Sequence, residues 1–295
     1  MSRRIRARGG RGGRGARGVR RAWRSTYRVL FHVLVALVMF TSLFPFLWML
    51  STSFKTLNEA LTWPPTVFPK APNLLAYQDI LTKTGIFHYL ANTVIYAGAG
   101  ASLAILFSSL AGFAFAKYRF AGRRVLFALV LATMMIPFQI TLIPVFLILK
   151  TLGWINTFMG LIVPGLGDAF GIFLIRQFAF GVPDELLDSA RIDGAGEVRI
   201  FSTIFLPLCA PAVGTLLVLS FMNRWNDLFW PLIVTTGDKL RTIQLGLIAM
   251  QMSLWETIWP QLTASMVLVL IPILLLYIFL QRYFTQGIVL TGLKG

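Results

Sequence analysis

The chain has 295 residues, of which 57% are hydrophobic and only 13% are charged. This composition excludes an ordinary soluble domain, which must keep a polar surface, and predicts an all-α polytopic membrane protein. A single cysteine, Cys209, and two histidines, His32 and His88, exclude an internal disulfide and leave no His/Cys cluster for a metal ion.

The formal net charge of +16 comes mostly from residues 1–28, which contain eleven arginines and no acidic residue. Their RGGRGARG pattern also occurs in segments that bind nucleic acid. A disordered cytoplasmic tail that follows the positive-inside rule explains the same residues. We therefore expect such a tail and no nucleic-acid partner.

Six apolar segments follow, each near the roughly 20 residues that a helix needs to cross a bilayer. We expect transmembrane helices at residues 29–50, 91–116, 125–149, 157–179, 208–234 and 262–281. The first is expected to be retained, because no signal-peptide cleavage pattern follows it. Lysines and arginines number 20 on the N-terminal side of this arrangement and 7 on the other, which predicts that both termini are cytoplasmic.

Two further features suggest how these helices pack. The first outer loop, about residues 51–90, is rich in proline and is expected to pack on the spans or on an external partner. Prolines inside a membrane helix are tolerated where neighbouring helices or a wet cavity satisfy the freed carbonyls. The spans contain four of them, so we expect the helices to surround a cavity: Pro137, Pro144, Pro164 and Pro231.

Residues 180–207 form a cytoplasmic loop in this arrangement and are predicted to fold as two short helices. Pro183 suits the first position of a helix, and Gly194 suits a left-handed helix stop. An apolar stripe before Pro207 consists of Ile200, Phe201, Ile204 and Phe205. The residues fit a compact helix-turn-helix with an exposed charged face, and equally an interfacial helix that merely joins two spans.

The segment DSARIDGA, residues 188–195, with Leu206 and Pro207 after it, resembles the cytoplasmic loop of carbohydrate ABC importer permeases of the maltose-importer type. That family carries a pattern close to E-A-A-x-x-x-G. Asp188 and Ser189 depart from it by small, chemically similar replacements. Other segments that look like the family cover most of the chain outside the arginine tail: FPFLWMLSTSFKT, RFAGRRVLFAL, MMIPFQITLIPVFLILKTLGWINTFMGLIVP, FLIRQF and LTGLKG.

The resemblance implies a type I importer permease fold of six transmembrane helices in residues 29–284, in the cytoplasmic (inner) membrane of a bacterium. It implies that the loop is a coupling helix that contacts a cytoplasmic ATPase through Asp188, Ser189, Ala190, Arg191, Asp193, Gly194 and Ala195. In this interpretation Ala190 and Gly194 permit close approach, and Arg191 and Asp193 make charge-assisted hydrogen bonds with the partner. The C-terminal tail, residues 285–295, would reach the ATPase interface through Leu290, Gly292, Leu293 and Lys294.

The chain lacks a G-x-x-x-x-G-K-[ST] phosphate loop, so ATP and Mg²⁺ are expected on a partner ATPase, with no cofactor on this chain. The resemblance implies as partners a second homologous permease, two ATPase subunits, an extracytoplasmic solute-binding protein and a carbohydrate, within membrane lipid. An ABC permease for another solute, such as glycerol phosphate, stays open. An intramembrane enzyme is disfavoured because His and Cys are not clustered, and a secondary transporter because no repeat is visible.

Polar residues at membrane depth are informative, because an unpaired charge at the bilayer centre costs at least about 2.5 kcal/mol. We expect six residues to line one polar cavity in the substrate pathway: Gln139, Asp168, Asn223, Trp225, Asn226 and Asp227. Arg224 and Asp227 lie three apart on a predicted helix and can neutralise each other, which leaves amides and an aromatic face for an uncharged sugar. Alternatively, Asp168 and the WND segment stabilise broken helices or face the partner permease.

Overall fold

The computed structural model describes residues 13–253 and 258–292, and all regular structure within them is helical. Side chains are described for residues 28–251, 258–279 and 281. The three long helices are α1 (Gly13–Ser53), α4 (Ile86–Lys117) and α15 (Trp259–Gly292). Between α1 and α4 lie α2 (Leu57–Ala60) and α3 (Leu75–Lys83).

The middle of the chain forms shorter helical pieces. They are α5 (Arg123–Thr133), α6 (Phe138–Thr151), α7 (Phe158–Ile162), a 3₁₀ turn (Val163–Gly165), α8 (Ala169–Ala179) and α9 (Asp184–Ile192). These are followed by α10 (Glu197–Ile200), a π-helical turn (Phe201–Phe205), α11 (Leu206–Leu208), α12 (Ala210–Trp225), α13 (Phe229–Val234) and α14 (Ile243–Ser253).

Three described helices are long and apolar enough to cross a bilayer, at Arg28–Ser53, Ile86–Lys117 and Trp259–Phe279. Three bent pairs of helices pass the same test, which gives up to six crossings if each pair is one span. The sequence therefore located the apolar segments correctly. Its assumption that the third, fourth and fifth are continuous helices is wrong.

The breaks have local causes. The third span bends by 101° between α5 and α6, where Pro137 lacks an N–H and disfavours a helical Ile136. The fourth bends by 45° between the 3₁₀ turn, which contains Pro164, and α8. An 82° bend at Cys209 separates α11 from α12. The predicted fifth span is also divided, because α12 ends at Trp225 and α13 is a separate helix.

Both ends of the chain differ from the predicted boundaries. Helix α1 begins at Gly13, so residues 13–28, predicted to be disordered, are helical. Their arginines and alanines are good helix formers, which favours this extension. At the other end α15 continues to Gly292, beyond the predicted boundary at residue 281. Residues 285–292 of the predicted tail are therefore a continuation of the last span.

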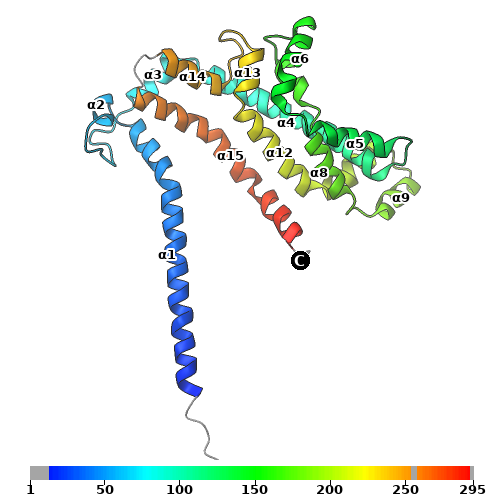
Figure 1. The fold of residues 1–295 in the computed structure, drawn as a ribbon, viewed down its shortest axis with the longest axis horizontal. Helices are drawn as coiled ribbons and strands as arrows, with labels where there is room; N and C mark the ends of the chain where they lie inside the picture. Colours follow the sequence, from blue (N-terminus) through cyan, green and yellow to red (C-terminus); the bar gives the residue numbers. More distant parts are fainter. Residues whose placement is uncertain (1–12, 254–257, 293–295) are drawn as a thin grey trace, which may run out of the picture.

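Helix α4 is the centre of the packed body (Figure 1) and makes its most extensive contacts with α8 and α12. Glycines permit these contacts: a Cβ on Gly112 would lie 2.7 Å from Ile175 Cγ2 and 3.1 Å from the backbone nitrogen of Arg176. Helices α2 and α3, in the first outer loop, pack against α15, as expected for that loop.

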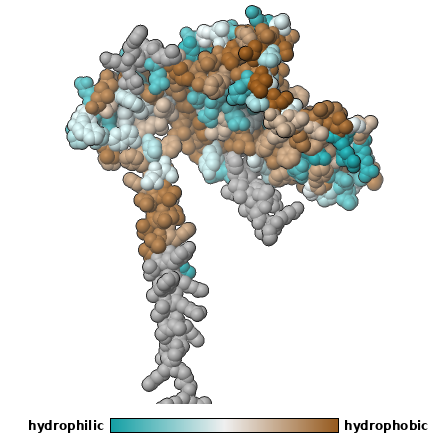
Figure 2. All heavy atoms as spheres, in the orientation of Figure 1, coloured by the Kyte–Doolittle hydropathy of each residue, from teal (hydrophilic) through white to brown (hydrophobic). Residues whose placement is uncertain are grey.

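Helix α1 extends away from this body (Figure 1) and contacts α15 near its C-terminal end. None of its most apolar 18-residue stretch is buried within the chain. Figure 2 shows the described part of this helix as a mainly hydrophobic surface, whereas hydrophilic residues gather around α9. An apolar surface of this size requires lipid or another membrane subunit around it.

The α4–α8 contact gives a first prediction. Gly112→Ala should lower the thermal midpoint of the purified chain, because overpacking of a close contact costs about 1–3 kcal/mol. Gly98→Ala is the matched control, since a Cβ at Gly98 on the same helix has no neighbour within 4 Å and alanine favours helix. Equal midpoints for the two variants would contradict the close packing of α4 on α8.

Candidate functional site

The predicted loop at residues 180–207 forms a helix-turn-helix, as expected. Helix α9 begins after Pro183, which occupies the cap rather than the first helical position. The helix ends in a Schellman motif: Gly194 has φ +82° and donates its N–H to the Arg191 carbonyl at 3.0 Å, and Ala195 donates to the Ala190 carbonyl at 2.9 Å. Glycine permits this left-handed backbone, so the sequence correctly predicted the stop at Gly194.

Arg191 joins the two helices of the loop. Its guanidinium bonds to Asp188 Oδ1 at 2.7 Å on α9, and its Nε bonds to Glu197 Oε1 at 2.8 Å on α10. Tyr118, directly after α4, donates its hydroxyl to the other oxygen of Glu197. Hydrogen bonds from Arg191 and Tyr118 hold the pKa of Glu197 below its usual range. The loop is thus tied to α4 through a charged network.

Lys117, the last residue of α4, makes a second tie. Its Nζ donates to Asp184 Oδ1 at 2.6 Å and to the Val182 carbonyl at 2.5 Å. The Lys117 side chain is almost fully buried, whereas Asp184 is exposed. The hydrogen bond from Lys117 lowers the pKa of Asp184.

The apolar side of the loop packs on the membrane helices. Leu187, Ile200 and Phe205 are fully buried in one cluster with Phe113 of α4 and Ile175 of α8. The rings of Phe113 and Phe205 lie 4.4 Å apart, centre to centre. The apolar stripe that the sequence predicts before Pro207 therefore points into the body, and the loop is part of the core rather than a loose connection.

The remaining surface of the loop differs in part from the expected one. Four predicted contact residues are exposed: Asp188, Ser189, Asp193 and Gly194. Ala190 and Ala195 instead pack against the buried cluster, and Arg191 forms ion pairs within the loop, whereas its contact with a partner stays a prediction. The prediction overlooked two apolar residues, Ile192 and Val198, which are 87% and 83% exposed.

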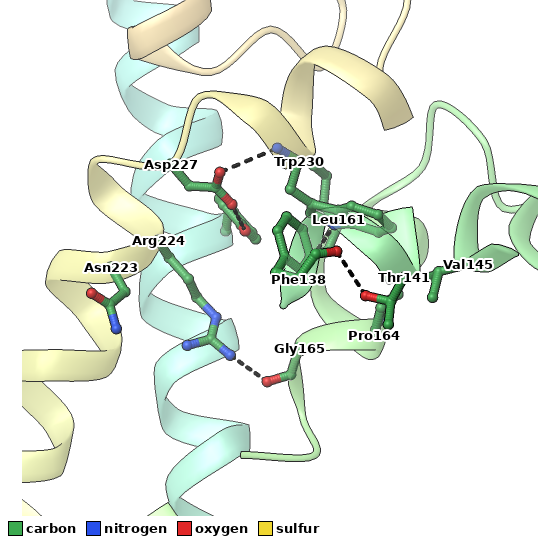
Figure 3. Close-up of a pocket in the computed structure, with 11 residues that line it drawn as sticks. Phe138, Thr141, Val145, Leu161, Pro164, Gly165, Asn223, Arg224, Asp227 and Trp230 are labelled. Carbon is green, nitrogen blue, oxygen red and sulfur yellow. Dashed lines mark hydrogen bonds between the residues drawn. The ribbon is translucent and has the colours of Figure 1, made fainter. Parts of the chain in front are cut away.

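A second candidate site is a cavity of about 300 Å³ among α4, α6, α7, α12 and α13. Its lining residues are Tyr96, Phe138, Thr141, Val145, Leu161, Pro164, Gly165, Asn223, Arg224, Asp227 and Trp230. Figure 3 shows Asn223, Arg224 and Asp227 on one side of the opening and Phe138, Leu161 and Trp230 on the other. The cavity combines charged, amide and aromatic groups, and two of the six predicted pathway residues, Asn223 and Asp227, line it.

Arg224 crosses this cavity (Figure 3). Its Nη2 donates to the Gly165 carbonyl at 2.6 Å, in the turn that breaks the fourth span, and its Nη1 donates to the Ser220 carbonyl at 3.2 Å. Gly100 on α4 makes room for the side chain, since a Cβ there would lie 2.6 Å from Arg224 Nε. The guanidinium therefore satisfies a carbonyl that the broken helix leaves without a helical partner.

Asp227 does not form the predicted ion pair with Arg224. Its Oδ2 accepts from the Tyr96 hydroxyl at 2.8 Å, and its Oδ1 accepts from the Trp230 backbone N–H at 3.2 Å. Helix α12 ends at Trp225, so Asp227 lies beyond the helical geometry on which the expected pairing depends. Asp227 instead fixes the start of α13 against α4.

Four of the six predicted pathway residues are not lining residues of this cavity. Trp225 is fully buried and stacks on Phe221, with ring centres 5.4 Å apart. Gln139 and Asn226 are exposed elsewhere, and the Asn226 amide donates to its own helix at Met222. Asp168 caps α8 by accepting from the Gly171 N–H at 3.1 Å, which favours the alternative that it stabilises a broken helix.

The prediction also overlooked cavity residues outside the WND segment. Tyr96 and Trp230 are aromatic side chains with a polar end, and each uses that end in a hydrogen bond inside the body. The sequence signal that could have identified Tyr96 and Trp230 is that each places a hydrogen-bonding group within an apolar segment. Among the described residues no group of three His, Cys, Asp or Glu could bind a metal.

The predicted tail contacts are only partly within the structure. Leu290 and Gly292 belong to α15, and nothing is described of their side chains. Leu293 and Lys294 lie outside the described residues.

Comparison with known proteins shows which family this chain resembles. The profile of the family "binding-protein-dependent transport system inner membrane component" matches residues 104–289. An arabinooligosaccharide transport system permease protein of Halalkalibacterium halodurans is 36% identical, over 88% of this chain and 94% of its own length. A lactose transport system permease protein of Rhizobium radiobacter is 32% identical, over 86% of this chain and 92% of its own length. An sn-glycerol-3-phosphate transport system permease protein of Agrobacterium fabrum is 30% identical, over 91% of this chain and 98% of its own length.

The fold also matches a solved structure. A bacterial ABC transporter involved in the import of the acidic polysaccharide alginate contains a chain that superposes with a TM-score of 0.78 at 24% identity, covering 88% of this chain and 97% of that one. The chain belongs to the family of inner membrane components of binding-protein-dependent transport systems. It is a permease subunit rather than an enzyme, and the resemblance noted in the sequence is confirmed.

The turn of the loop gives a second prediction. Gly194→Ala should accelerate hydrogen exchange at the Gly194 position and at Ala195 by roughly 5- to 30-fold, because a left-handed backbone costs an L-residue about 1–2 kcal/mol. Gly196→Ala is the control, since Gly196 has φ −71° and open space around its Cβ position. Unchanged exchange in Gly194→Ala would show that the Schellman turn does not depend on glycine.

Proposed function

We propose that this chain is the membrane-spanning subunit of an ATP-driven, binding-protein-dependent importer of a carbohydrate, and that it forms half of the solute pathway. A second homologous permease would supply the other half. Two separate ATPase subunits would bind ATP and Mg²⁺, and an extracytoplasmic solute-binding protein would deliver the solute. In this arrangement both termini are cytoplasmic, as the distribution of lysine and arginine predicts.

The observation that carries the proposal is the attachment of the loop. Lys117 and Tyr118 tie it to the end of α4, and Phe113 packs against it, so a force on the loop is transmitted to the membrane helices. Its outer surface presents carboxylates together with the exposed Ile192 and Val198. Exposed apolar side chains beside charged ones suit a docking surface for a protein partner.

The choice of a carbohydrate rests on two supports. Relatives of this chain are named for arabinooligosaccharides and lactose. The cavity places the Asn223 amide and the Arg224 guanidinium opposite the aromatic ring of Trp230, which is a suitable set for hydrogen bonding and stacking with a sugar.

A second candidate is a permease for an anionic solute such as glycerol phosphate. One relative is named for sn-glycerol-3-phosphate. Arg224 also lines the cavity, and within the described residues it forms no ion pair. Reconstitution with the partner subunits decides between the two, because the solute-loaded binding protein that stimulates ATP hydrolysis identifies the solute.

The end of α15 belongs to the same proposal. Leu290 and Gly292 of α15, together with Leu293 and Lys294 beyond the described residues, would contact the ATPase pair. Removal of residues 289–295 would then lower ATPase stimulation while assembly with the second permease is retained.

The docking surface gives a third prediction. Ile192→Asp should reduce co-purification of the ATPase by at least about tenfold, because a charge would be buried in an apolar contact at a cost above 1.4 kcal/mol. Trp63→Asp is a matched control, since Trp63 is also 87% exposed but lies in the first outer loop. Retention of the ATPase by Ile192→Asp would remove this surface from the proposed interface.

The cavity gives a fourth prediction, which compares two asparagines three residues apart. Asn223→Ala should lower solute flux about three- to tenfold, the value expected for one lost hydrogen bond of about 1 kcal/mol. Asn226→Ala should transport normally, because its amide bonds only to its own helix and it does not line the cavity. Equal flux for both variants at limiting solute would exclude direct contact of Asn223 with the solute.

A further inference from the structure

A second cavity lies at the opposite end of the fold from α9, between the C-terminal end of α1, the start of α15 and the first outer loop. Its volume is about 450 Å³. The lining is apolar toward the membrane helices, with Pro45, Met49 and Met266. It is polar toward the loop, with Thr52, Lys55 and Glu59. The cavity is therefore amphipathic along its length.

Among the described residues, Lys55 is the only lysine or arginine that lines this cavity, and its side chain is buried, with the residue 3% exposed. Its Nζ donates to the Thr66 carbonyl and lies 4.7 Å from the centre of the Trp48 ring. Within the described residues no carboxylate oxygen lies within 4.0 Å of this ammonium group. Burial lowers the pKa of Lys55, and the negative charge of Glu59 on the same wall offsets this effect only in part.

Thr52 provides an independent indication of a missing partner. It is 6% exposed, and its Oγ1 has no hydrogen-bond partner in the described part of the chain. Buried hydroxyls are normally satisfied, and an unsatisfied one costs about 1–3 kcal/mol. Because Thr52 and Lys55 both line the cavity, one ligand oxygen group can accept from the two side chains.

Glu59 supplies the opposite charge on the same wall. Its Oε1 accepts from the Lys70 N–H at 2.7 Å and from the Thr66 hydroxyl at 3.2 Å, which fixes the carboxylate in place. The cavity thus presents one fixed cation and one fixed anion to its contents. A zwitterionic group matches that pattern better than a simple anion.

The position of the cavity indicates the kind of molecule that carries such a group. Trp48 and Trp259 line it at the ends of α1 and α15, and tryptophans at helix ends are typical of the boundary between hydrocarbon and headgroups. Within the described residues, none of the most apolar stretch of α1 is buried, so an acyl chain has an apolar surface to follow away from the cavity.

We infer that this cavity binds a phospholipid whose headgroup carries an amino group. The phosphate accepts hydrogen bonds from Lys55 and Thr52, the ammonium group faces Glu59, and the acyl chains extend over Pro45, Met49 and Met266. Placing this lipid in the outer leaflet rests on the topology proposed above. The binding chemistry does not depend on that topology.

The test uses the full-length chain, purified in detergent and stripped of lipid, with thermal midpoint and native mass spectrometry as readouts. Phosphatidylethanolamine should raise the midpoint and remain bound. Phosphatidylglycerol lacks the amino group and phosphatidylcholine lacks its N–H donors, so each should bind at least about fivefold more weakly. Inorganic phosphate at the same concentration should give no stabilisation, which separates a lipid site from a free-anion site.

Three variants locate the site. Lys55→Gln, which retains a donor for the Thr66 carbonyl, and Thr52→Val, which keeps the side-chain shape, should each weaken phosphatidylethanolamine at least about fivefold. Glu59→Gln should remove the preference for phosphatidylethanolamine over phosphatidylglycerol. Lys70→Gln is the control, since Lys70 is exposed on the same loop and only its backbone contacts Glu59.

The inference would be overturned by equal binding of the three lipids, by protection from inorganic phosphate alone, or by parental lipid affinity in Thr52→Val. The unliganded midpoint of each variant reports whether it folds. If Lys55→Gln does not fold, Thr52→Val and Glu59→Gln decide the question, because neither removes a hydrogen bond donated to the backbone.

Discussion

The structure depends on the contact between one unbroken helix, α4, and the elements that pack on it. At one end Tyr96 bonds to Asp227, and Gly100 makes room for Arg224 beside the cavity. At the other end Lys117 and Tyr118 tie down the loop. Gly100 and Lys117 are separated by about 25 Å along the helix at 1.5 Å per residue. A helix of that length can transmit a displacement without bending, whereas the neighbouring spans are interrupted.

The interruptions surround the cavity, and they explain why its polar residues are not all available to a solute. Arg224 satisfies the Gly165 carbonyl and Trp230 satisfies the Leu161 carbonyl, both near the break in the fourth span. Asp227 holds the start of α13. Broken helices inside a membrane require such partners. Asn223 lines the cavity and makes no side-chain hydrogen bond of this kind to the described residues, which makes it the sharpest probe of solute contact.

The sequence predicted the features that depend on local chemistry. Apolar length located the spans, and Gly194 located the turn of the loop because few other residues adopt its backbone conformation. It did not predict which way a polar side chain points when its helix ends nearby. Trp225 was expected in the pathway and is buried, because its ring stacks on Phe221 one turn earlier on the same face of α12. The expected pairing of Arg224 with Asp227 is absent because α12 ends at Trp225, before Asp227.

Periodicity and composition do not predict contacts between segments that are distant in the sequence. Nothing in the sequence near Lys117 indicates that Asp184, 67 residues later, will lie 2.6 Å away. Arg191 was assigned to a partner because a guanidinium group makes charge-assisted hydrogen bonds. Glu197 forms an ion pair with Arg191 because the turn at Gly194 brings α10 back beside α9.

The central claim is that the loop acts on the pathway through its attachment to α4. The direct test is the number of solute molecules transported per ATP hydrolysed in the assembled transporter that carries Lys117→Met together with Tyr118→Phe. These changes remove the polar ties and keep the apolar packing of both side chains. The account predicts that the ATPase still binds and hydrolyses ATP while transport per ATP falls several-fold. An unchanged ratio in the doubly substituted transporter would contradict it.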